Sequence, residues 1–504
     1  MASEEPIWLP VTEYSPDMPD FENPGSDVIL NCIPATPNSY GPAPSFASFG
    51  GSLSKRCQGA STLLSPVDNV YIFAGDIHDL YLYNSSNLTP PLNVSSTSGV
   101  YNTPPDGRWF FTQMGSRAIA TNFNDPIQTF TMDTSSKFAT LAAAAPKAMY
   151  CDIIKNFLVV ANTNDPTNGF QPQRVWWSAV NDPTNWPTPG TAAAAIVQSS
   201  FNDLLGPFGQ ISGVVGDLGN ADGAVFMEKA IWRMMYAGPP AVFDFSPAEG
   251  ARGTRIPGSL IKVGFYVYYI ADNGFYVFDG TSSIPIGVNK VDKTFFATFD
   301  GNYLDRVVGS HDPQNKCVYW DFPSTAAING NPDTRYVFNY VINKWSVVQI
   351  SAEMTFQSLS LGYTLDTMPG PLDSLLYPLD SRVWTGGNLV LGGFNTTHTF
   401  GYYNGPNLQA TIDTTENEGI KGKMSFINNA RPYIDGGTSS ISIAARNRLV
   451  DIPIYGPSYT MNSIGNCPLR SQGRYFRARS VVPAGDSWSH FQGVHIYGIP
   501  LGDR

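Results

Sequence analysis

Hydrophobic and polar positions alternate in short runs along most of this chain, and each run ends at a turn. Seven stretches share one pattern, in which a run of aromatic or β-branched residues is followed by a turn signal and a second such run. Strand-forming side chains on both sides of a turn predict a β-hairpin. The predicted hairpins lie at residues 69–84, 108–126, 156–183, 223–239, 265–281, 316–346 and 389–405.

The spacing of these hairpins predicts a repetitive fold. They recur roughly every 35 to 75 residues, which is the length of one four-stranded propeller blade with or without insertions. Radial repetition of small sheets hides strand edges. We therefore expect a β-propeller over residues 61–405, although the imperfect units do not determine the number of blades.

The two ends of the chain differ from this middle part. Residues 1–60 are rich in Pro, Ser and Gly with little periodicity, and they predict an extended arm that lies over a folded body. Residues 406–504 contain runs that alternate with a period of two, which predict an antiparallel β-sandwich. In the run from Tyr475 to Ser480, Phe476, Ala478 and Ser480 share one face. The predicted fold class is all-β.

Composition agrees with many short strands joined by tight turns. Of 504 residues, 14% are charged and 13% are aromatic, which excludes a disordered chain. The net charge of −11 disfavours a surface built to bind nucleic acid throughout. Residues 421–504 carry a net +6 and residues 1–420 a net −17, so we expect two functional surfaces of opposite charge.

The pentapeptide NDPTN occurs twice, at residues 164–168 and 181–185. Paired aspartates could bind calcium, but each copy offers one carboxylate and no following Glu. Proline after Asp suits the second position of a type I turn, so turn chemistry is favoured over metal binding. Asn and Gly also tolerate the positive φ of a type I′ hairpin turn. The predicted structural-turn residues are Asp165, Pro166, Asp182, Pro183, Trp186, Asn273 and Gly274.

Motifs of catalysis are missing from the sequence. It holds no HExxH, P-loop or GxSxG pattern, and its five cysteines are scattered without a CxxC pair. We therefore predict no enzyme, no catalytic or cofactor-binding residue, no metal and free, reduced thiols. The start lacks the pattern of a signal peptide, and no apolar run is long enough to span a membrane.

Basic residues cluster near the C-terminus. Two interpretations remain open for them: a solvated strand face, or a contact with an acidic partner or a phosphate backbone. Under the second, the candidate contacts with a neighbouring subunit or an adaptor are Arg470, Arg474, Arg477 and Arg479.

The order of several stretches resembles the tail nozzle proteins of short-tailed bacteriophages, the group of tail tubular protein B and packaged DNA stabilisation protein. The resemblance rests on residues 9–34, VWWSAVNDPTNW, residues 250–280, residues 312–346 and the closing run from Gly473. It implies a structural virion protein synthesised in the host cytoplasm, present as a ring of six copies in the virion tail. Such a ring would line or close the DNA channel and take part in genome retention and ejection. Its neighbours would be the tail adaptor beneath the portal and tail fibres or a plug protein.

Two other functions stay open. One is a glycan-binding or glycan-cleaving, sialidase-like propeller. The run from Ser178 to Trp186 is similar to the Asp-box turn of sialidases, but its spacing differs. Nothing in the sequence groups three arginines with a Tyr and a Glu, as such enzymes require. The other is a host receptor-binding protein with aromatic loop tips such as Trp176, Trp177 and Trp186.

Overall fold

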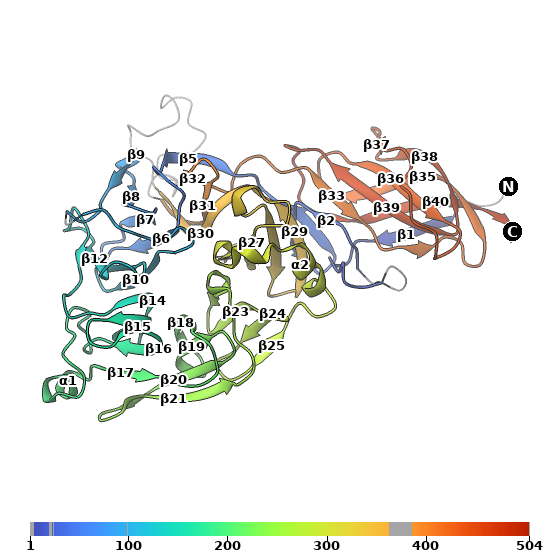
Figure 1. Cartoon of the computed structure of the whole chain (residues 1–504). Helices are drawn as coiled ribbons and strands as arrows, with labels where there is room; N and C mark the ends of the chain where they lie inside the picture. The colour runs from blue at the N-terminus through green and yellow to red at the C-terminus, as the bar shows by residue number, and fades with distance from the viewer. Residues whose placement is uncertain (1–4, 20–22, 24, 98, 362–385, 503–504) are drawn as a thin grey trace.

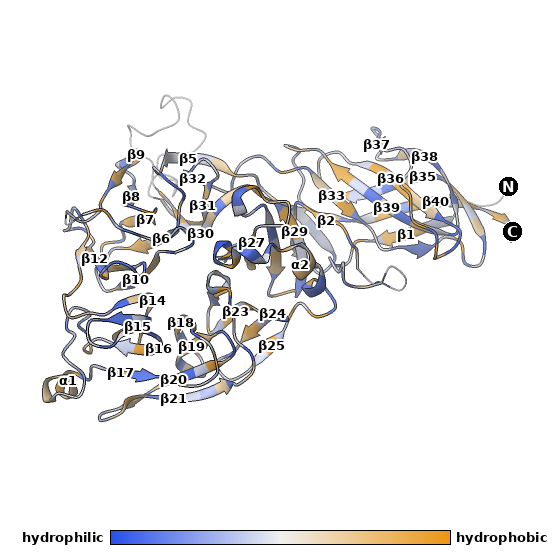
Figure 2. Cartoon of the chain, viewed as in Figure 1, coloured by the Kyte–Doolittle hydropathy of each residue, from blue (hydrophilic) through white to orange (hydrophobic). Residues whose placement is uncertain are grey.

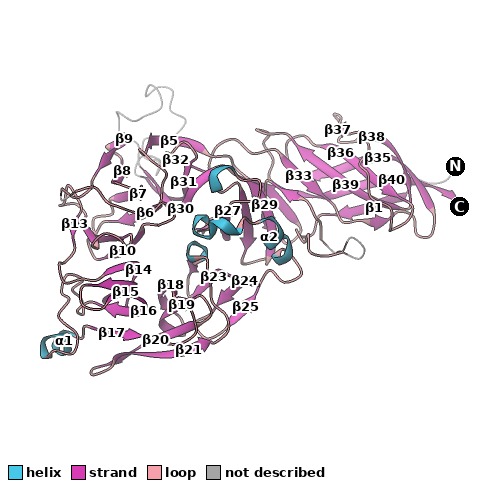
Figure 3. Cartoon of the chain, in the orientation of Figure 1, coloured by secondary structure: helices cyan, strands magenta, loops and turns pink. Residues whose placement is uncertain are grey.

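The computed structural model describes residues 5–19, 23, 25–97, 99–361 and 386–502. Over these residues the chain is almost entirely β-structure, with two short α-helices (Figure 3). A ring of small sheets forms one end of the molecule and an elongated sandwich forms the other (Figure 1). Both described ends of the chain lie at the tip of the sandwich farthest from the ring (Figure 1).

The ring is a β-propeller, as predicted, and its described residues form seven blades of four antiparallel strands. Blades 1 to 3 are β6 (Gly59–Leu64), β7 (Val70–Gly75), β8 (Leu80–Asn84), β9 (Asn87–Asn93); β10 (Phe110–Met114), β11 (Arg117–Thr121), β12 (Gln128–Thr131), β13 (Ala139–Thr140); and β14 (Lys147–Ile154), β15 (Phe157–Asp165), β16 (Gly169–Trp177), β17 (Ser200–Asp203). Blades 4 and 5 are β18 (Ile211–Leu218), β19 (Ala221–Met227), β20 (Ile231–Gly238), β21 (Val242–Glu249); and β22 (Ile261–Val263), β23 (Tyr266–Ala271), β24 (Gly274–Phe278), β25 (Ser283–Pro285). Blades 6 and 7 are β26 (Val308–Asp312), β27 (Cys317–Phe322), β28 (Thr334–Asn339), β29 (Lys344–Gln349); and β30 (Ala352–Leu361), β31 (Gly386–Asn395), β32 (Thr399–Tyr402), β5 (Ala47–Ser52). Each of the seven predicted hairpins falls within a different blade.

The N-terminal segment closes the ring. Strand β5 pairs antiparallel with β32 and so becomes the outer strand of blade 7, whose other three strands are β30, β31 and β32. The chain then enters blade 1 through β6, which contacts β30 of blade 7. Closure by a strand from the other end of the chain removes the sheet edge that an open ring would expose.

Aromatic and aliphatic side chains fill the seams between blades. Between blades 7 and 1, the ring of Tyr83 lies 4.8 Å from that of Phe400, and between blades 3 and 4 the ring of Trp177 lies 5.2 Å from that of Phe243. Apolar residues lie along the strands of both domains (Figure 2). Since each blade has a neighbouring blade on each of its two faces, the core is divided among these seams.

The sandwich combines both ends of the chain. One sheet contains β1 (Glu5–Pro10), β3 (Cys32–Thr36), β4 (Ser39–Pro42), β40 (Phe491–Gly502), β35 (Met424–Ile434) and β38 (Cys467–Gly473). The other contains β2 (Ile29–Leu30), β33 (Ala410–Asp413), β39 (Tyr475–Val482), β36 (Ser440–Arg446), β37 (Tyr459–Thr460) and β34 (Asn417–Glu418). On β39, Phe476, Ala478 and Ser480 are fully buried, and Arg477 between them is buried as well. Residues 1–60 are thus divided between the two domains.

Strand β2 joins the two domains into one continuous sheet. Leu30 pairs in parallel with Val347 of blade 6 on one side and antiparallel with Thr411 of the sandwich on the other. Backbone hydrogen bonds therefore run from blade 6 through β2 into β33. Such a junction ties the propeller to the sandwich, since separating them there requires breaking sheet hydrogen bonds.

The few helices are short and lie in connections between strands. They are α1 (Ala192–Val197), α2 (Asp292–Thr298), and the 3-10 turns η1 (Pro257–Ser259), η2 (Gly301–Arg306) and η3 (Ile328–Gly330). The N-terminal segment caps α2, because the carboxylate of Asp17 accepts hydrogen bonds from the backbone N–H groups of Lys293 and Thr294 at 2.7 and 2.8 Å.

Candidate functional site

Three arginines occupy equivalent positions at one mouth of the propeller. Arg56, Arg108 and Arg306 come two or three residues before β6, β10 and β26, which are the first strands of blades 1, 2 and 6. The first strands contact one another around the ring, from β30 through β6 and β10 to β14. Because each blade is entered through its first strand, the starts of these strands lie at one end of the ring axis. We call these three residues the axial arginine cluster.

Hydrogen bonds between the blade-to-blade loops hold the axial arginine cluster together. Arg108 Nη1 donates to the backbone oxygen of Val307 at 2.9 Å, next to Arg306. Arg56 Nη2 donates to the backbone oxygen of Pro105 at 2.8 Å, and Arg306 Nη2 donates to Asp106 Oδ1 at 3.4 Å. The loop from Pro105 to Arg108 therefore links all three arginines.

Burial outweighs the nearby negative charges at two of the three arginines of the axial arginine cluster. Burial, and next the charge of Arg306, lower the pKa of Arg56 to about 10. Burial also lowers the pKa of Arg108. Loss of solvation disfavours a charged guanidinium. It is opposed at Arg56 by the charge of Glu353 and at Arg108 by that of Asp305, while the oxygen atoms that accept hydrogen bonds from both arginines are backbone oxygens.

Carboxyl groups and one tyrosine surround the axial arginine cluster. Asp106 is largely exposed at the rim, and burial raises the pKa of the neighbouring Asp305. Glu353 is buried and already accepts hydrogen bonds from Cys57 N at 3.0 Å and His398 Nδ1 at 2.7 Å. Tyr150, on the first strand of blade 3, is buried, and burial raises its pKa. Planar guanidinium donors in such a setting can hold a carboxylate or phosphate.

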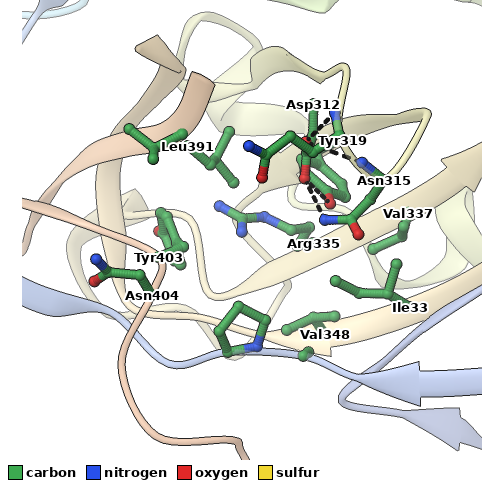
Figure 4. Close-up of a pocket in the computed structure, with 14 residues that line it drawn as sticks. Ile33, Asp312, Asn315, Tyr319, Arg335, Val337, Val348, Leu391, Tyr403 and Asn404 are labelled. Atoms are coloured by element: carbon green, nitrogen blue, oxygen red, sulfur yellow. Dashed lines mark hydrogen bonds between the residues drawn. The ribbon is translucent and has the colours of Figure 1, made fainter. Parts of the chain in front are cut away.

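A small pocket lies at the seam between blades 6 and 7. Its cavity volume is about 120 Å³, and β3 and the segment after β4 cover one side of it. Arg335 lies at its centre, with Tyr403 on one side and Tyr319 above, as Figure 4 shows. Val337, Val348, Leu391 and Ile33 supply much of the apolar wall.

The polar groups of this pocket already form hydrogen bonds and ion pairs with neighbouring side chains. Arg335 donates to both carboxylate oxygens of Asp321 at 2.6 and 2.7 Å, and its guanidinium lies 4.1 Å from the ring centre of Tyr403. Tyr319 donates to Asp312 at 2.9 Å, and burial raises its pKa well above its usual value. Such groups neither accept nor release protons readily near neutral pH. The pocket is therefore better suited to stabilising the blade 6–blade 7 seam than to chemistry.

The two NDPTN copies form turns, but of unequal strength. Asp165 Oδ1 accepts from the N–H groups of Thr167 and Asn168, and its other oxygen accepts from Arg174 at 2.9 Å. Asp182 Oδ1 accepts from the N–H of Thr184 at 3.0 Å. Pro166 and Pro183 directly follow these aspartates. The first copy therefore adds a buried ion pair to its turn.

Trp186 packs where the chain returns to blade 3. It is buried, its Nε1 donates to the backbone oxygen of Pro183 at 2.7 Å, and its ring meets that of Trp176 edge to face at 6.4 Å. Trp176 and Trp177 are buried as well. None of the three tryptophans is thus an exposed loop tip.

The predicted type I′ turn at Asn273 and Gly274 is wrong in detail. Ala271 pairs with Gly274, so the two loop residues are Asp272 and Asn273. Gly274 alone has a positive φ, +146°, and it is the first residue of β24. Glycine is required there for a second reason, because a Cβ atom would lie 2.4 Å from a carboxylate oxygen of Asp292.

Two of the four arginines predicted to bind a neighbour are used inside the fold. Arg477 is buried and pairs with Asp27 at 3.0 Å, and Arg479 binds both oxygens of Asp413 at 2.7 and 2.8 Å. Arg474 is half-buried, and Arg470 is exposed on β38. The predicted contact surface therefore does not exist as a cluster of four free cations.

The acidic residues of the N-terminal segment also change the charge pattern expected from the sequence. Residues 1–46, which supply β1 to β4, hold seven acidic and no basic side chains. Counted by domain, the sandwich (residues 1–46 and 406–504) has a net charge of −4 and the propeller (residues 47–405) a net charge of −7. The expected opposition of a basic and an acidic domain is wrong, because the acidic N-terminal strands pack onto the basic C-terminal ones.

Sequence reasoning missed the axial arginine cluster, although a signal was present. An arginine precedes the first strand of three repeat units, in KRCQGASTLL, GRWFFTQM and DRVVGSHD. Aligning the units by their first strands would have shown the shared position. Within the described residues, no group of three or more His, Cys, Asp or Glu side chains could hold a metal ion, and no helix is long and apolar enough to cross a membrane.

Comparisons with known proteins show similarity of fold alone. No family model matches the chain, and no curated protein matches it significantly. A crystal structure of exo-β-1,3-galactanase from Phanerochaete chrysosporium is 10% identical over 91% of this chain and 100% of its own, with a TM-score of 0.29. A protein described as a glycoside hydrolase is 9% identical over 89% and 99%, with a TM-score of 0.24. The computationally designed Ika8 protein is 8% identical over 72% and 99%, with a TM-score of 0.35.

The prediction that the chain is no enzyme does not hold as an inference from the sequence. It rested on missing motifs alone, and the structures similar to this chain include an exo-β-1,3-galactanase and a protein described as a glycoside hydrolase. A propeller site is assembled from side chains on several blades, which a search for local motifs does not detect. The absence of such motifs is therefore no ground for excluding catalysis.

Proposed function

We propose that this chain is a subunit of a ring in the short tail of a bacteriophage, of the nozzle type. The order of the resembling sequence stretches supports this function, and so does the continuous sheet that joins propeller and sandwich. The ring would hold six copies, lie beneath the tail adaptor, contact fibres or a plug, and let DNA pass during ejection.

The single observation that carries the proposal is an exposed apolar surface on the sandwich. Val450, Ile452, Ile454 and Ile464 are 82, 82, 77 and 71% exposed. They lie in the loops before and after β37, on the domain away from the propeller (Figure 1). Val450, Ile452 and Ile454 occupy alternate positions of one loop, and such a group of exposed apolar residues favours contact with another protein. We call these four residues the apolar loop surface.

A second copy of the chain is the partner that suits the apolar loop surface. Head-to-tail contacts between copies close into a ring when the rotation between them allows it. Apolar contacts also explain how two acidic domains could associate, since their net charges of −4 and −7 repel. The apolar loop surface thus replaces the four arginines as the proposed subunit contact.

Mass measurement combined with electron micrographs of the purified chain tests the proposal. The expected result is a six-copy ring with an open or closed bore. A chain that stays monomeric at concentrations up to about 100 μM, far above the Kd of a stable interface, would contradict the ring function.

Two variants separate the ring from the proposed contact. Ile452→Ser combined with Ile454→Ser should abolish the ring and leave thermal unfolding unchanged. Ile196→Ser, at a site 79% exposed on α1, is the matched control and should assemble normally. If both variants assemble, the ring function stands and the contact lies elsewhere.

A further inference from the structure

We infer that the axial arginine cluster is a binding site for a compact oxyanion, either a sugar-acid carboxylate or a phosphate group. This inference concerns the mouth of the propeller and does not depend on the ring function. Arg56, Arg108 and Arg306 would supply the donors, each from a different blade connection.

The first argument is which partners the arginines have. Arg56 and Arg108 are anchored by backbone carbonyl oxygens, and the second guanidinium nitrogen of Arg108 faces the sulfur of Met354 at 3.5 Å. Neutral acceptors fix the orientation of a guanidinium and leave its charge in place. Arg306 alone has a carboxylate partner, Asp106, at the long distance of 3.4 Å.

The second argument is an unused donor. Arg306 Nε is buried and has no hydrogen-bond partner among the described residues. Its side chain is only 14% exposed. A buried N–H group without an acceptor destabilises the fold. An anion that accepts a hydrogen bond from it would remove this penalty and would therefore bind more tightly.

The third argument concerns the carboxyl groups nearby. Glu353 is engaged with Cys57 and His398, so its charge acts on Arg56 without a hydrogen bond between the two side chains. Asp106 is 67% exposed at the rim, and Asp305 is adjacent to Arg306 in the chain. These two acids repel an extended polyanion at the rim of the cluster. The site therefore selects a compact ligand over a nucleic-acid strand.

Titration calorimetry of the full chain with glucuronate and with inorganic phosphate tests the inference. We expect saturable binding of one molecule per chain for at least one probe. Glucuronate alone would identify a sugar acid as the ligand class, and phosphate alone would identify a phosphorylated ligand. Absence of saturable binding for both probes would overturn the inference.

Three variants assign any binding to the axial arginine cluster. Arg306→Gln should weaken binding about tenfold, because it removes a charged donor. Asp106→Asn should strengthen binding about threefold, because it removes a competing carboxylate. Arg255→Gln, which removes an exposed arginine paired with Asp272, is the matched control and should bind normally.

Arg306→Gln and Asp106→Asn together keep the test decisive even if one of the two variants folds poorly. Unfolding curves show whether Arg306→Gln remains folded, and Asp106→Asn alters a largely exposed side chain. Equal affinity in the wild type, Arg306→Gln and Asp106→Asn would show that the ligand does not bind at the axial arginine cluster. A tighter complex with Asp106→Asn would support it on its own, since a purely structural role predicts no gain.

Discussion

Asp27 and Arg477 form an ion pair of 3.0 Å between residues 450 positions apart in the chain. Together with Arg479 and Asp413, this pair shows why the basic C-terminal segment is not a free docking surface. Its cations are balanced by acidic groups that only the folded chain brings near, and its arginines act mainly within the sandwich.

Arg479→Ser should destabilise the fold more than it affects assembly. Asp413 is buried and would keep Tyr455 as a hydrogen-bond donor but lose its cation. Removing one partner of such a pair costs about 3 kcal/mol of unfolding free energy. Urea denaturation measures the loss. Arg470→Ser, on an exposed position of the same sheet, should change stability by less than about 0.5 kcal/mol, and equal losses in both variants would contradict this account.

The two NDPTN turns should respond differently to the same substitution. Asp182→Ala removes an exposed turn contact and should cost about 1 kcal/mol. Asp165→Ala should cost about 3 kcal/mol, because it also leaves the buried Arg174 with Asp203 as its remaining carboxylate. Thermal unfolding of both variants measures the difference. A larger loss for Asp182→Ala would show that the buried ion pair contributes little.

Gly274→Ala should be far more harmful than Gly264→Ala. Both positions have a positive φ, but a Cβ at Gly264 meets nothing within 4 Å. That variant should lose about 1 kcal/mol, the cost of the left-handed backbone alone. A Cβ at Gly274 would collide with the buried Asp292 carboxylate, so the loss should reach about 3 kcal/mol. Equal losses, measured by urea denaturation, would mean that Asp292 moves aside freely.

Asp292 should make the protein less stable as the pH rises from about 4 to 6. Burial raises the pKa of its carboxyl group to about 6, from a usual value near 3.8. Within this window the folded chain holds a proton that the unfolded chain releases, so each step upward in pH favours unfolding. Above pH 6 the cost is fully present, and below pH 4 it is absent.

Asp292→Asn removes this dependence and gives the measurement. Relative to the wild type, the variant should gain stability between pH 4 and pH 7, by at most roughly 3 kcal/mol for a shift of about two pH units. Unfolding curves at both pH values supply the comparison. A difference between the two proteins that stays constant with pH would contradict the raised pKa.

The sequence by itself determined the strands and the repeat. Alternation with a period of two is a local property, so the hairpins within all seven blades could be predicted without knowledge of the fold. The NDPTN turns were equally local, since Asp and Pro bend the chain through contacts within four residues. The turn at Gly274 was placed only approximately, because its φ depends on the pairing register as well as on residue type.

Only the tertiary structure decided which distant segments meet. Strand β5 closes blade 7, β2 joins blade 6 to the sandwich, and Asp27 neutralises Arg477 across nearly the whole chain. Strand pairing and ion pairing depend on distance in space, which residue patterns do not encode. The axial arginine cluster arises in the same way, because Arg56, Arg108 and Arg306 are ordinary charged residues until ring closure brings blades 6, 7, 1 and 2 around one axis.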